Sequence, residues 1–329
     1  MKFLDHDIAP LGMGCWPIGG AMMRGEDTLG YANADDAESI RTIHAALDCG
    51  ITLFDTAAAY GAGHAERLLS KALKGRSDVV IVSKIGIAID EDTKQLLGPE
   101  ISPDTVIPAI EKCLSRLGRD CVDQILLHQN DLALPAAEAI FDEMEKARSA
   151  GKIRSYGWST DFSKAVAAVE HRPGFMGVEH AMNVLVDAKR IQNVVHANGL
   201  SALIRSPLAM GLLTGKYDQD TQMQRNDIRA TTNLTVKYFE NARANPAFLS
   251  KFDAIRDLLT IDGRSLTQGA LCWLWGKSEN NIPIPGARTV EQIEGIAGAL
   301  AFGPLPAHVM ADIERLIERP ADDLEDREL

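Results

Sequence analysis

The sequence predicts an α/β protein, a (β/α)8 TIM barrel whose carboxyl-end loops form the active site. Short runs rich in Val, Ile and Leu alternate with longer amphipathic stretches almost from end to end, which is typical of βα units around a parallel sheet. Eight such units favour a closed barrel over an open sheet. The length of 329 residues suits a barrel of this kind, so 1–329 is predicted to be a single domain.

The elements are expected to alternate along the whole chain. The expected strands, in order, are LGMGC (11–15), ITLFD (51–55), DVVIVSK (78–84), VDQILLH (122–128), IRSYGWS (153–159), MGVEHAM (176–182), SALIRS (201–206) and NIPIPG (281–286). Helical spacing of apolar residues predicts helices at Asp36–Asp48, Ala65–Lys74, Pro103–Leu117, Pro135–Ala150, Asp161–Glu170 and Asp187–Ala197. Ser159, Thr160 and Asp161 are possible N-caps for the helix near residue 161.

Three connections are longer than usual, at Ala21–Ala34, Gly86–Ser102 and Tyr217–Ala244. Each follows the carboxyl end of a strand, where barrel active sites lie. The polar segment 217–244 is predicted to be a mobile loop that covers a cofactor. A disordered insertion with no role is the alternative interpretation.

Charge and composition restrict the class of partner. The formal net charge of -12 disfavours a nucleic-acid partner. Acidic residues gather in the C-terminal tail DDLEDREL. Neither a signal peptide nor a membrane-spanning run is recognisable, so a cytoplasmic location is expected. The five cysteines lack CxxC spacing and are interpreted as small core residues.

Four polar residues fall near the ends of three successive predicted strands: Asp55, Tyr60, Lys84 and His128. If those strands are parallel neighbours, the four side chains surround one point. A lysine ammonium there would lower the tyrosine pKa, and an aspartate would keep the lysine charged. Such a group can protonate a carbonyl oxygen while a nicotinamide cofactor supplies hydride to its carbon. A structural Asp–Lys pair and a packing histidine are the alternatives.

The sequence also contains residues typical of two other kinds of site. In YGAGHAE, Gly61 and Gly63 follow a strand as in a dinucleotide-binding turn, but Glu66 stands where a third glycine belongs. The glycines are therefore expected to shape the bend at Tyr60, and Glu66 to begin a solvated helix. A metal site would use Asp55, His64, His128 and His180. These histidines show no HxH or HExxH spacing, so no metal is predicted.

The chain resembles the aldo-keto reductase family from LGMGCW to IPIPGARTVEQIEG. The motifs are FDTAAAYG with Asp55 and Tyr60, VSK with Lys84, LLHQND with His128, then SPLAMGLLTGKY and IPGARTVEQ. The resemblance implies NADPH without metal and reversible reduction of an aldehyde or ketone to an alcohol. It makes Tyr60 the general acid, tuned by Lys84 and Asp55, while His128 orients the carbonyl and Trp16 lines the substrate pocket.

The resemblance also assigns cofactor contacts, some of them altered in this chain. Ser159 and Glu179 stand where the nicotinamide carboxamide is held, with Glu179 in place of the usual Gln. Thr160 stands where Asn is common, and Arg205 replaces the aromatic residue beneath the nicotinamide ring. The pyrophosphate segment is represented by Ser206, Pro207, Leu208, Gly211 and Lys216. The segment around the adenosine 2′-phosphate is represented by Pro285, Gly286, Arg288 and Gln292.

The leading hypothesis is thus a NADPH-dependent oxidoreductase acting on a small carbonyl or alcohol. The alternatives are a catalytically weak, NADP(H)-binding subunit that senses redox state, and a metal-dependent barrel hydrolase or lyase. Gly295 and Ile296 replace the Glu–Asn pair that often binds adenine, so the strength of the NADPH preference stays open. The sequence also leaves open the substrate, the physiological direction and the oligomeric state.

Overall fold

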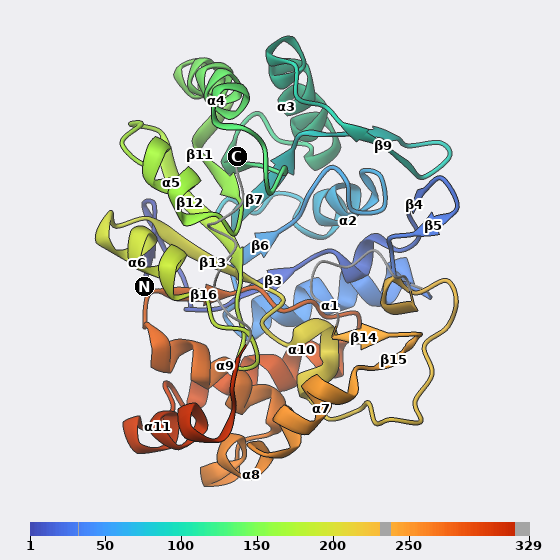
Figure 1. Cartoon of the computed structure of the whole chain (residues 1–329). Helices are drawn as coiled ribbons and strands as arrows, with labels where there is room; N and C mark the ends of the chain where they lie inside the picture. The colour runs from blue at the N-terminus through green and yellow to red at the C-terminus, as the bar shows by residue number, and fades with distance from the viewer. Residues whose placement is uncertain (32, 231–237, 320–329) are drawn as a thin grey trace.

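Eight parallel strands form the centre of the molecule, as the sequence predicted. The computed structural model describes residues 1–31, 33–230 and 238–319 (Figure 1). A bridge between Gly14 and Gly286 brings the first strand beside the last, so the sheet is nearly closed into a (β/α)8 barrel. The strands, in sheet order, are β16 (Asn281–Pro283), β13 (Ser201–Arg205), β12 (Phe175–Ala181), β11 (Ile153–Ser159), β10 (Val122–Leu127), β7 (Val80–Ile85), β6 (Leu53–Asp55) and β3 (Gly12–Gly14).

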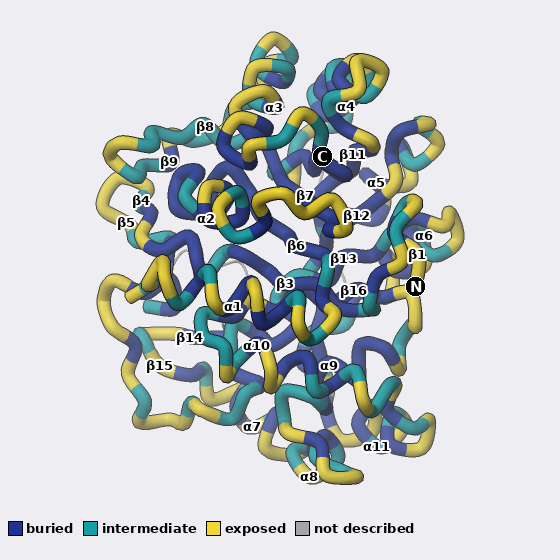
Figure 2. The backbone as a smooth tube through the Cα atoms, turned by 180° about the vertical axis from the view of Figure 1, so that it is seen from behind, coloured by how far each residue is buried: buried dark blue, intermediate teal, exposed yellow. Residues whose placement is uncertain are grey.

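Helices surround this sheet, and the expected ones are all present. They are α1 (Asp36–Asp48), α2 (His64–Ala72), α3 (Pro103–Leu117), α4 (Leu134–Ser149), α5 (Ser163–Val169) and α6 (Lys189–Ala197), followed by α7 (Pro246–Asp253), α8 (Arg256–Leu259), α9 (Leu266–Lys277), α10 (Val290–Ala297) and α11 (Ala307–Leu316). For α1 and α3, the first and the last residue both agree with the prediction. Figure 2 shows buried strands inside a ring of helices that alternate between buried and exposed residues.

Two local expectations are wrong. The N-cap of α5 is Phe162, whose side chain makes no capping hydrogen bond. The Asp161 carboxylate instead accepts a hydrogen bond from Ala181 N. Glu66 does not begin a solvated helix. It is fully buried, and its carboxylate accepts hydrogen bonds from Arg116 and from Ser83, so this charge is paired inside the wall between α2, α3 and β7.

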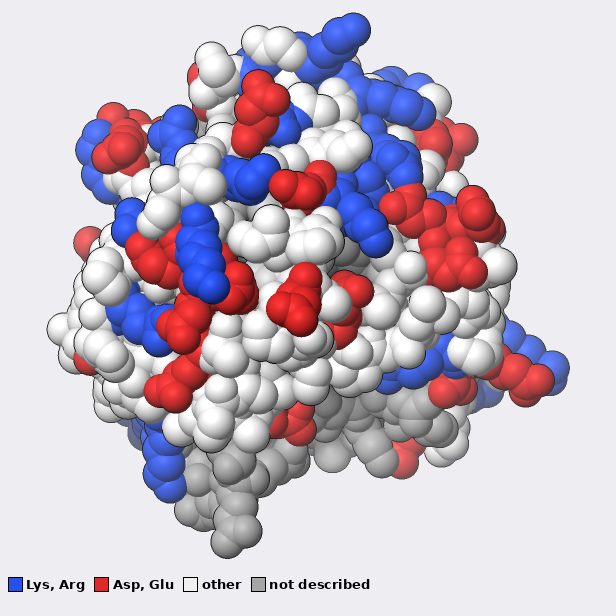
Figure 3. Space-filling view, turned by 90° about the horizontal axis from the view of Figure 1, so that it is seen from above, with Lys and Arg blue, Asp and Glu red and all other residues white. Residues whose placement is uncertain are grey.

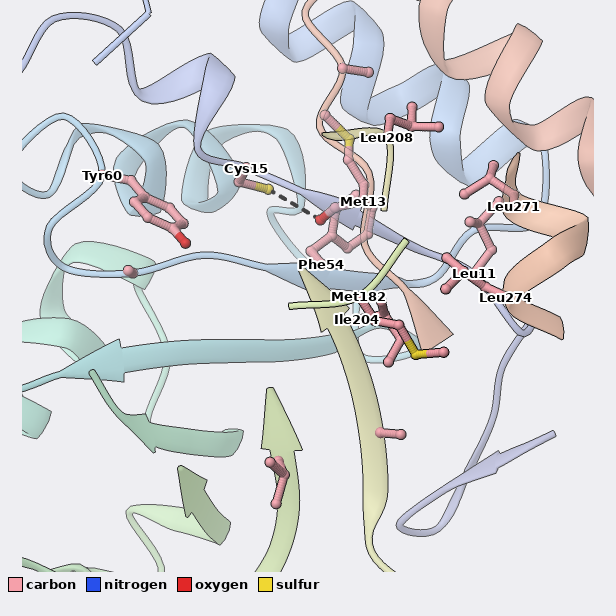
Figure 4. Packing of buried hydrophobic residues seen from close by; sticks show 14 of the residues in the cluster. Leu11, Met13, Cys15, Phe54, Tyr60, Met182, Ile204, Leu208, Leu271 and Leu274 are labelled. Atoms are coloured by element: carbon pink, nitrogen blue, oxygen red, sulfur yellow. Dashed lines mark hydrogen bonds between the residues drawn. The ribbon is translucent and has the colours of Figure 1, made fainter. Parts of the chain in front are cut away.

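An N-terminal hairpin lies against the interior of the barrel. Its strands are β1 (Lys2–Phe3) and β2 (His6–Asp7). Phe3 and Ile8 pack in one buried cluster with residues that point into the barrel, namely Leu53, Val80, Val82, Leu126, Leu203, Ile282 and Ile284. The second and larger cluster fills the space between sheet and helices, where Leu11 meets Leu271 and Leu274 of α9 (Figure 4).

The first two long connections pair with each other, which the sequence did not predict. The first contains β4 (Met23–Arg24) and β5 (Asp27–Thr28), and the second contains β8 (Ile87–Asp90) and β9 (Gln95–Pro99). Together they form a four-stranded sheet in the order β5-β4-β9-β8. This sheet lies on the opposite side of the molecule from the N-terminal residue (Figure 1).

The third long connection contacts the first. Ile228 N donates to Gly30 O at 2.9 Å, and Asn33 donates through its side chain to Gln224 at 3.1 Å. The described part also holds a 3-10 turn (Ile228–Ala230) and the hairpin β14 (Phe239–Glu240) with β15 (Arg243–Ala244). The predicted mobile loop thus falls partly outside the described residues, at 231–237, and the acidic tail lies outside them entirely.

Surface charge is mixed on the face seen from above. Lys and Arg side chains alternate there with Asp and Glu (Figure 3). None of the helices in the described parts of the chain combines the length and the apolar character that crossing a bilayer requires.

Candidate active site

Lys84 is the centre of a buried polar cluster at the carboxyl ends of the strands. It belongs to β7, and Asp55 ends the neighbouring strand β6. The Lys84 ammonium lies 2.7 Å and 2.6 Å from the two carboxylate oxygens of Asp55, and it donates to Thr56 O at 3.0 Å. Both side chains are almost completely buried. The expected Asp–Lys pair is therefore present and shielded from water.

The turn after β6 brings Tyr60 to this pair. Thr56 N and Ala58 N donate to carbonyls of β7, so the segment continues alongside that strand. The Tyr60 hydroxyl lies 3.3 Å from the Lys84 ammonium. Gly61 has a φ of 62°, and a Cβ there would come within 2.0 Å of Gly19 O. Only glycine fits this close approach, which confirms that the glycine-containing loop shapes the bend at Tyr60.

Glu179 adds a second carboxylate to the cluster. It lies on β12, two strands beyond β10, and its side chain is buried. One carboxylate oxygen lies 3.0 Å from the Lys84 ammonium, and the other accepts from the Ser159 hydroxyl at 3.4 Å. Asp55 and Glu179 therefore compete for one ammonium.

The protonation behaviour of the cluster follows from burial and from these charges. Burial raises the pKa of Asp55 well above its ordinary value, and the negative charge of Glu179 adds to the effect. Burial would also raise the pKa of Glu179, but the Lys84 ammonium outweighs it and holds that pKa below the ordinary value. Burial acts to lower the pKa of Lys84, yet the two carboxylates raise it well above normal, so Lys84 stays charged.

Burial is also the largest influence on Tyr60. It raises the pKa of the phenol above its ordinary value, although the Lys84 ammonium acts in the opposite direction. The lowered tyrosine pKa that the sequence suggested is therefore wrong, because burial outweighs the ammonium. At neutral pH the phenol keeps its proton, which is the state that a general acid needs.

His128 lies beside Tyr60, directly after β10. Its backbone N donates to Ile85 O at 2.7 Å, and its ring meets the Tyr60 ring edge-on, with centroids 6.1 Å apart. Burial, with help from Lys84, lowers the pKa of the imidazole to about 3, so the ring is neutral at physiological pH. Nδ1 is buried without a hydrogen-bond partner.

Trp16 covers the other side of the tyrosine. Its ring stacks on Tyr60, with centroids 6.0 Å apart and an interplanar angle of 15°. It also meets Tyr31 edge-on, and Arg288 lies over the Tyr31 ring at 5.9 Å. A row of aromatic rings thus connects Tyr60 with Arg288. The sequence did not indicate Tyr31, because it lies in an irregular loop far from any motif.

Arg205 ends β13 and is held by Asp161, a partner that the sequence did not reveal. The two form an ion pair. Asp161 is itself fixed, because it accepts from Ala181 N of the intervening strand β12 at 2.7 Å. The sequence signal that could have revealed this pair is the opposite charge of the two residues, one just after β11 and one at the end of β13, on either side of β12. Thr160 is fully buried, and its hydroxyl donates to Asn130 O and accepts from Phe162 N.

The segment after β13 has an unusual backbone. Ser206, Ala209 and Met210 have φ values of 53°, 49° and 56°, and Gly211 has 99°. Ala209 N donates to Ser206 O and Gly211 N donates to Leu208 O, both at 2.9 Å, so these amides stabilise the turn itself. Pro207 and Leu208 of the same segment are buried, whereas Lys216 at its end is exposed.

The second expected cofactor segment lies after β16. Pro285 O accepts from Gly14 N at 3.0 Å, so Pro285 and Gly286 help to close the barrel. The Gln292 side chain accepts from Arg288 N at 2.9 Å and so fixes the start of α10. The Arg288 side chain borders a cavity of about 240 Å³. Other residues that line this cavity are Asn33, Tyr217, Asp227 and Arg229.

The four residues of the alternative metal site do not converge. His64 pairs with Asp36 at 2.7 Å on the outside of the barrel, and His180 contacts Gln192 of α6 at 2.8 Å. Within residues 1–31, 33–230 and 238–319, no group of three or more His, Cys, Asp or Glu side chains is arranged to hold a metal ion. All five cysteines are free, and Cys15, Cys113 and Cys272 are buried.

The barrel and its buried Asp–Lys–Tyr cluster define an oxidoreductase of the aldo-keto reductase type. The model of the Aldo/keto reductase family matches residues 10–318, so the chain belongs to that family. It is 31% identical to aldo-keto reductase YhdN of Bacillus subtilis, over 96% of this chain and 92% of the relative.

Solved structures show the same fold. The glycerol dehydrogenase AKR11B4 from Gluconobacter oxydans is 25% identical, with a TM-score of 0.79 and coverage of 97% of this chain and 96% of that one. An aldo-keto reductase from Klebsiella pneumoniae in complex with NADPH is 21% identical, with a TM-score of 0.67 and coverage of 97% and 94%.

Proposed function

We propose that the protein is an NADP(H)-dependent oxidoreductase that reversibly reduces the carbonyl of a small aldehyde or ketone to an alcohol. The observation that carries this proposal is the Tyr60 hydroxyl 3.3 Å from a fully buried Lys84, which is itself held by Asp55. Family membership supplies the class of reaction, and the cluster supplies the proton.

In this proposal Tyr60 donates its proton to the carbonyl oxygen. Lys84 stabilises the phenolate that remains, because its ammonium lies beside the hydroxyl and stays charged. Asp55 keeps Lys84 oriented. His128 is neutral and has a buried, unpartnered Nδ1, so its ring can hydrogen-bond the substrate oxygen without repelling Lys84. Trp16 and the loop residues around it exclude water from the phenol.

The proposed cofactor is NADP(H), which when bound supplies or accepts the hydride. The resemblance to the family assigns its pyrophosphate to the segment 206–211, and it assigns the carboxamide to Ser159 and Glu179, whose side chains are in contact. Arg288 borders a cavity and offers a guanidinium for a 2′-phosphate. The structure solved with NADPH is that of another family member and supports this choice of cofactor.

The proposal is tested by mixing the protein with NADPH and a panel of aldehydes, ketones and sugars while following nicotinamide absorbance. Each positive substrate is then tested in reverse, as the alcohol with NADP+. We expect oxidation of NADPH with at least one carbonyl class. Tight cofactor binding without turnover of any substrate would contradict the proposal and favour the redox-sensing alternative.

A further inference from the structure

The cluster around Lys84 contains one carboxyl group more than its ammonium can pair. Asp55 occupies Lys84 with both oxygens, and Glu179 approaches the same ammonium at 3.0 Å. The Glu179 oxygen that faces the ammonium accepts no hydrogen bond, although it is buried. Lys84 holds the pKa of Glu179 below its ordinary value and so keeps it ionised, and a further positive charge beside it would be attracted.

Among the described residues, Arg205 is a further cation that interacts with Glu179. Arg205 of β13 is paired with Asp161, so that pair is neutral as a whole. His128, beyond the end of β10, is neutral at physiological pH. Glu179 also interacts with the Asp55 carboxyl and with the uncharged hydroxyls of Ser159 and Tyr60.

We propose that Glu179 makes the site prefer the oxidised, positively charged nicotinamide over the reduced, neutral one. This inference rests on the proposed function, since it assumes that the nicotinamide binds beside Ser159 and Glu179. A glutamine here, as is usual in the family, would offer a hydrogen bond without charge. The carboxylate adds an attraction that only the oxidised ring receives.

The preference has a direction in the reaction. Because the cluster favours a positive charge, Glu179 promotes release of hydride from the coenzyme and opposes the reverse transfer. The charge of Glu179 is the cause of this preference. The raised pKa of Asp55 leaves the proton that the two carboxyl groups share on Asp55, and the lowered pKa of Glu179 keeps Glu179 ionised at neutral pH.

The decisive experiment is direct binding of NADP+ and NADPH to wild type and to Glu179→Gln, followed by calorimetry or by protein fluorescence. At about pH 7, we expect the substitution to raise the ratio Kd(NADP+)/Kd(NADPH) by about tenfold, a modest value for a unit charge in a partly screened site.

Ser159→Ala is the matched control, because it removes a neutral contact of the same carboxylate. It should weaken NADP+ and NADPH by similar factors. An unchanged ratio in Glu179→Gln would overturn the inference while leaving the proposed function standing. Failure of the wild type to bind either coenzyme would instead overturn the proposed function.

Wild type alone provides a second test if Glu179→Gln does not fold. Its Kd for NADP+ should be lower than its Kd for NADPH at about pH 7. A higher Kd for NADP+ than for NADPH would also reject the role of Glu179.

Discussion

In the proposed mechanism, Tyr60 donates the proton that the substrate oxygen receives. Replacing Tyr60 should therefore slow the chemical step without weakening cofactor binding. We expect Tyr60→Phe to lower kcat by roughly two to four orders of magnitude, the usual scale of general acid catalysis. The phenyl ring keeps the stack on Trp16, so NADPH binding should change little. Steady-state kinetics and a binding titration check both statements. Turnover close to that of wild type would reject Tyr60 as the acid.

His128 should contribute to loss of stability in acid. Its folded pKa of about 3 lies below the ordinary value of 6.5, so the unfolded chain binds the proton more readily. The destabilisation is absent above about pH 6.5 and grows as pH falls toward 3, reaching roughly 3 kcal/mol near pH 4.5. His180, whose pKa burial lowers to about 4, acts in the same direction.

His128→Gln tests this linkage, because glutamine stays neutral. Denaturant unfolding of wild type and variant should show a smaller loss of stability between about pH 7 and about pH 4.5 in the variant. The remaining loss belongs to His180 and to other groups. Parallel stability curves for the two proteins would contradict a buried, neutral His128.

The polar residues of the site were foreseeable from the sequence to different degrees. Asp55, Lys84 and His128 were predictable, since a residue at or beside the end of a parallel strand is placed by the strand itself. The pairing of Asp161 with Arg205 was not, because it depends on side chains that reach across β12. The raised pKa of Tyr60 was missed as well, since burial is a property of the whole surrounding structure.

At the scale of elements, β11 and β12 approach too closely for a side chain. A Cβ on Gly157 would lie 1.9 Å from Gly177 O, and the pairing register shifts beside Gly157. We expect Gly157→Ala to destabilise the protein by about 3 kcal/mol or more, because backbone rather than a flexible side chain must move. Chemical denaturation measures the loss.

Gly295 provides the opposite case on α10. A Cβ there would meet nothing within 4 Å, and the residue lies inside a helix. Gly295→Ala should therefore stabilise the protein by about 0.5 to 1 kcal/mol through helix propensity. If both alanine variants changed stability by the same amount, the close approach of β11 and β12 would not be the cause.

Regular elements were easier to predict than the loops. Apolar periodicity indicated the eight barrel strands and the helices α1 to α6, because each buries one stripe or both faces. The four strands β4, β5, β8 and β9 left no such signal. Two of them have only two residues each, and they are stabilised by pairing with a segment some 70 residues away, as in the hydrogen bond from Gly25 to Gln95.

For the whole molecule, the N-terminal hairpin contributes to stability rather than to chemistry. Phe3 is fully buried against the inward-facing residues of the barrel. The N-terminal residue lies on the opposite side of the molecule from the four-stranded sheet β5-β4-β9-β8 (Figure 1). We expect Phe3→Ala to cost about 3 to 5 kcal/mol of unfolding free energy.

Thermal unfolding and kinetics at 25 °C together test this assignment. Phe3→Ala should unfold at lower temperature but keep the kcat and KM of wild type while folded. Leu97→Ala is a suitable control, because Leu97 is 66% exposed and its loss should change stability by less than about 0.5 kcal/mol. A strong effect of Phe3→Ala on KM alone would place the hairpin in the substrate path.

The small sheet built from the first two long connections limits how this enzyme can be re-engineered. Met23 of β4 pairs with Gln95 of β9, so each loop holds the other in shape. If only one of the two segments is replaced by a relative's loop, the other loses the strand with which it pairs. Designers who wish to alter selectivity should therefore transplant both segments as one cassette.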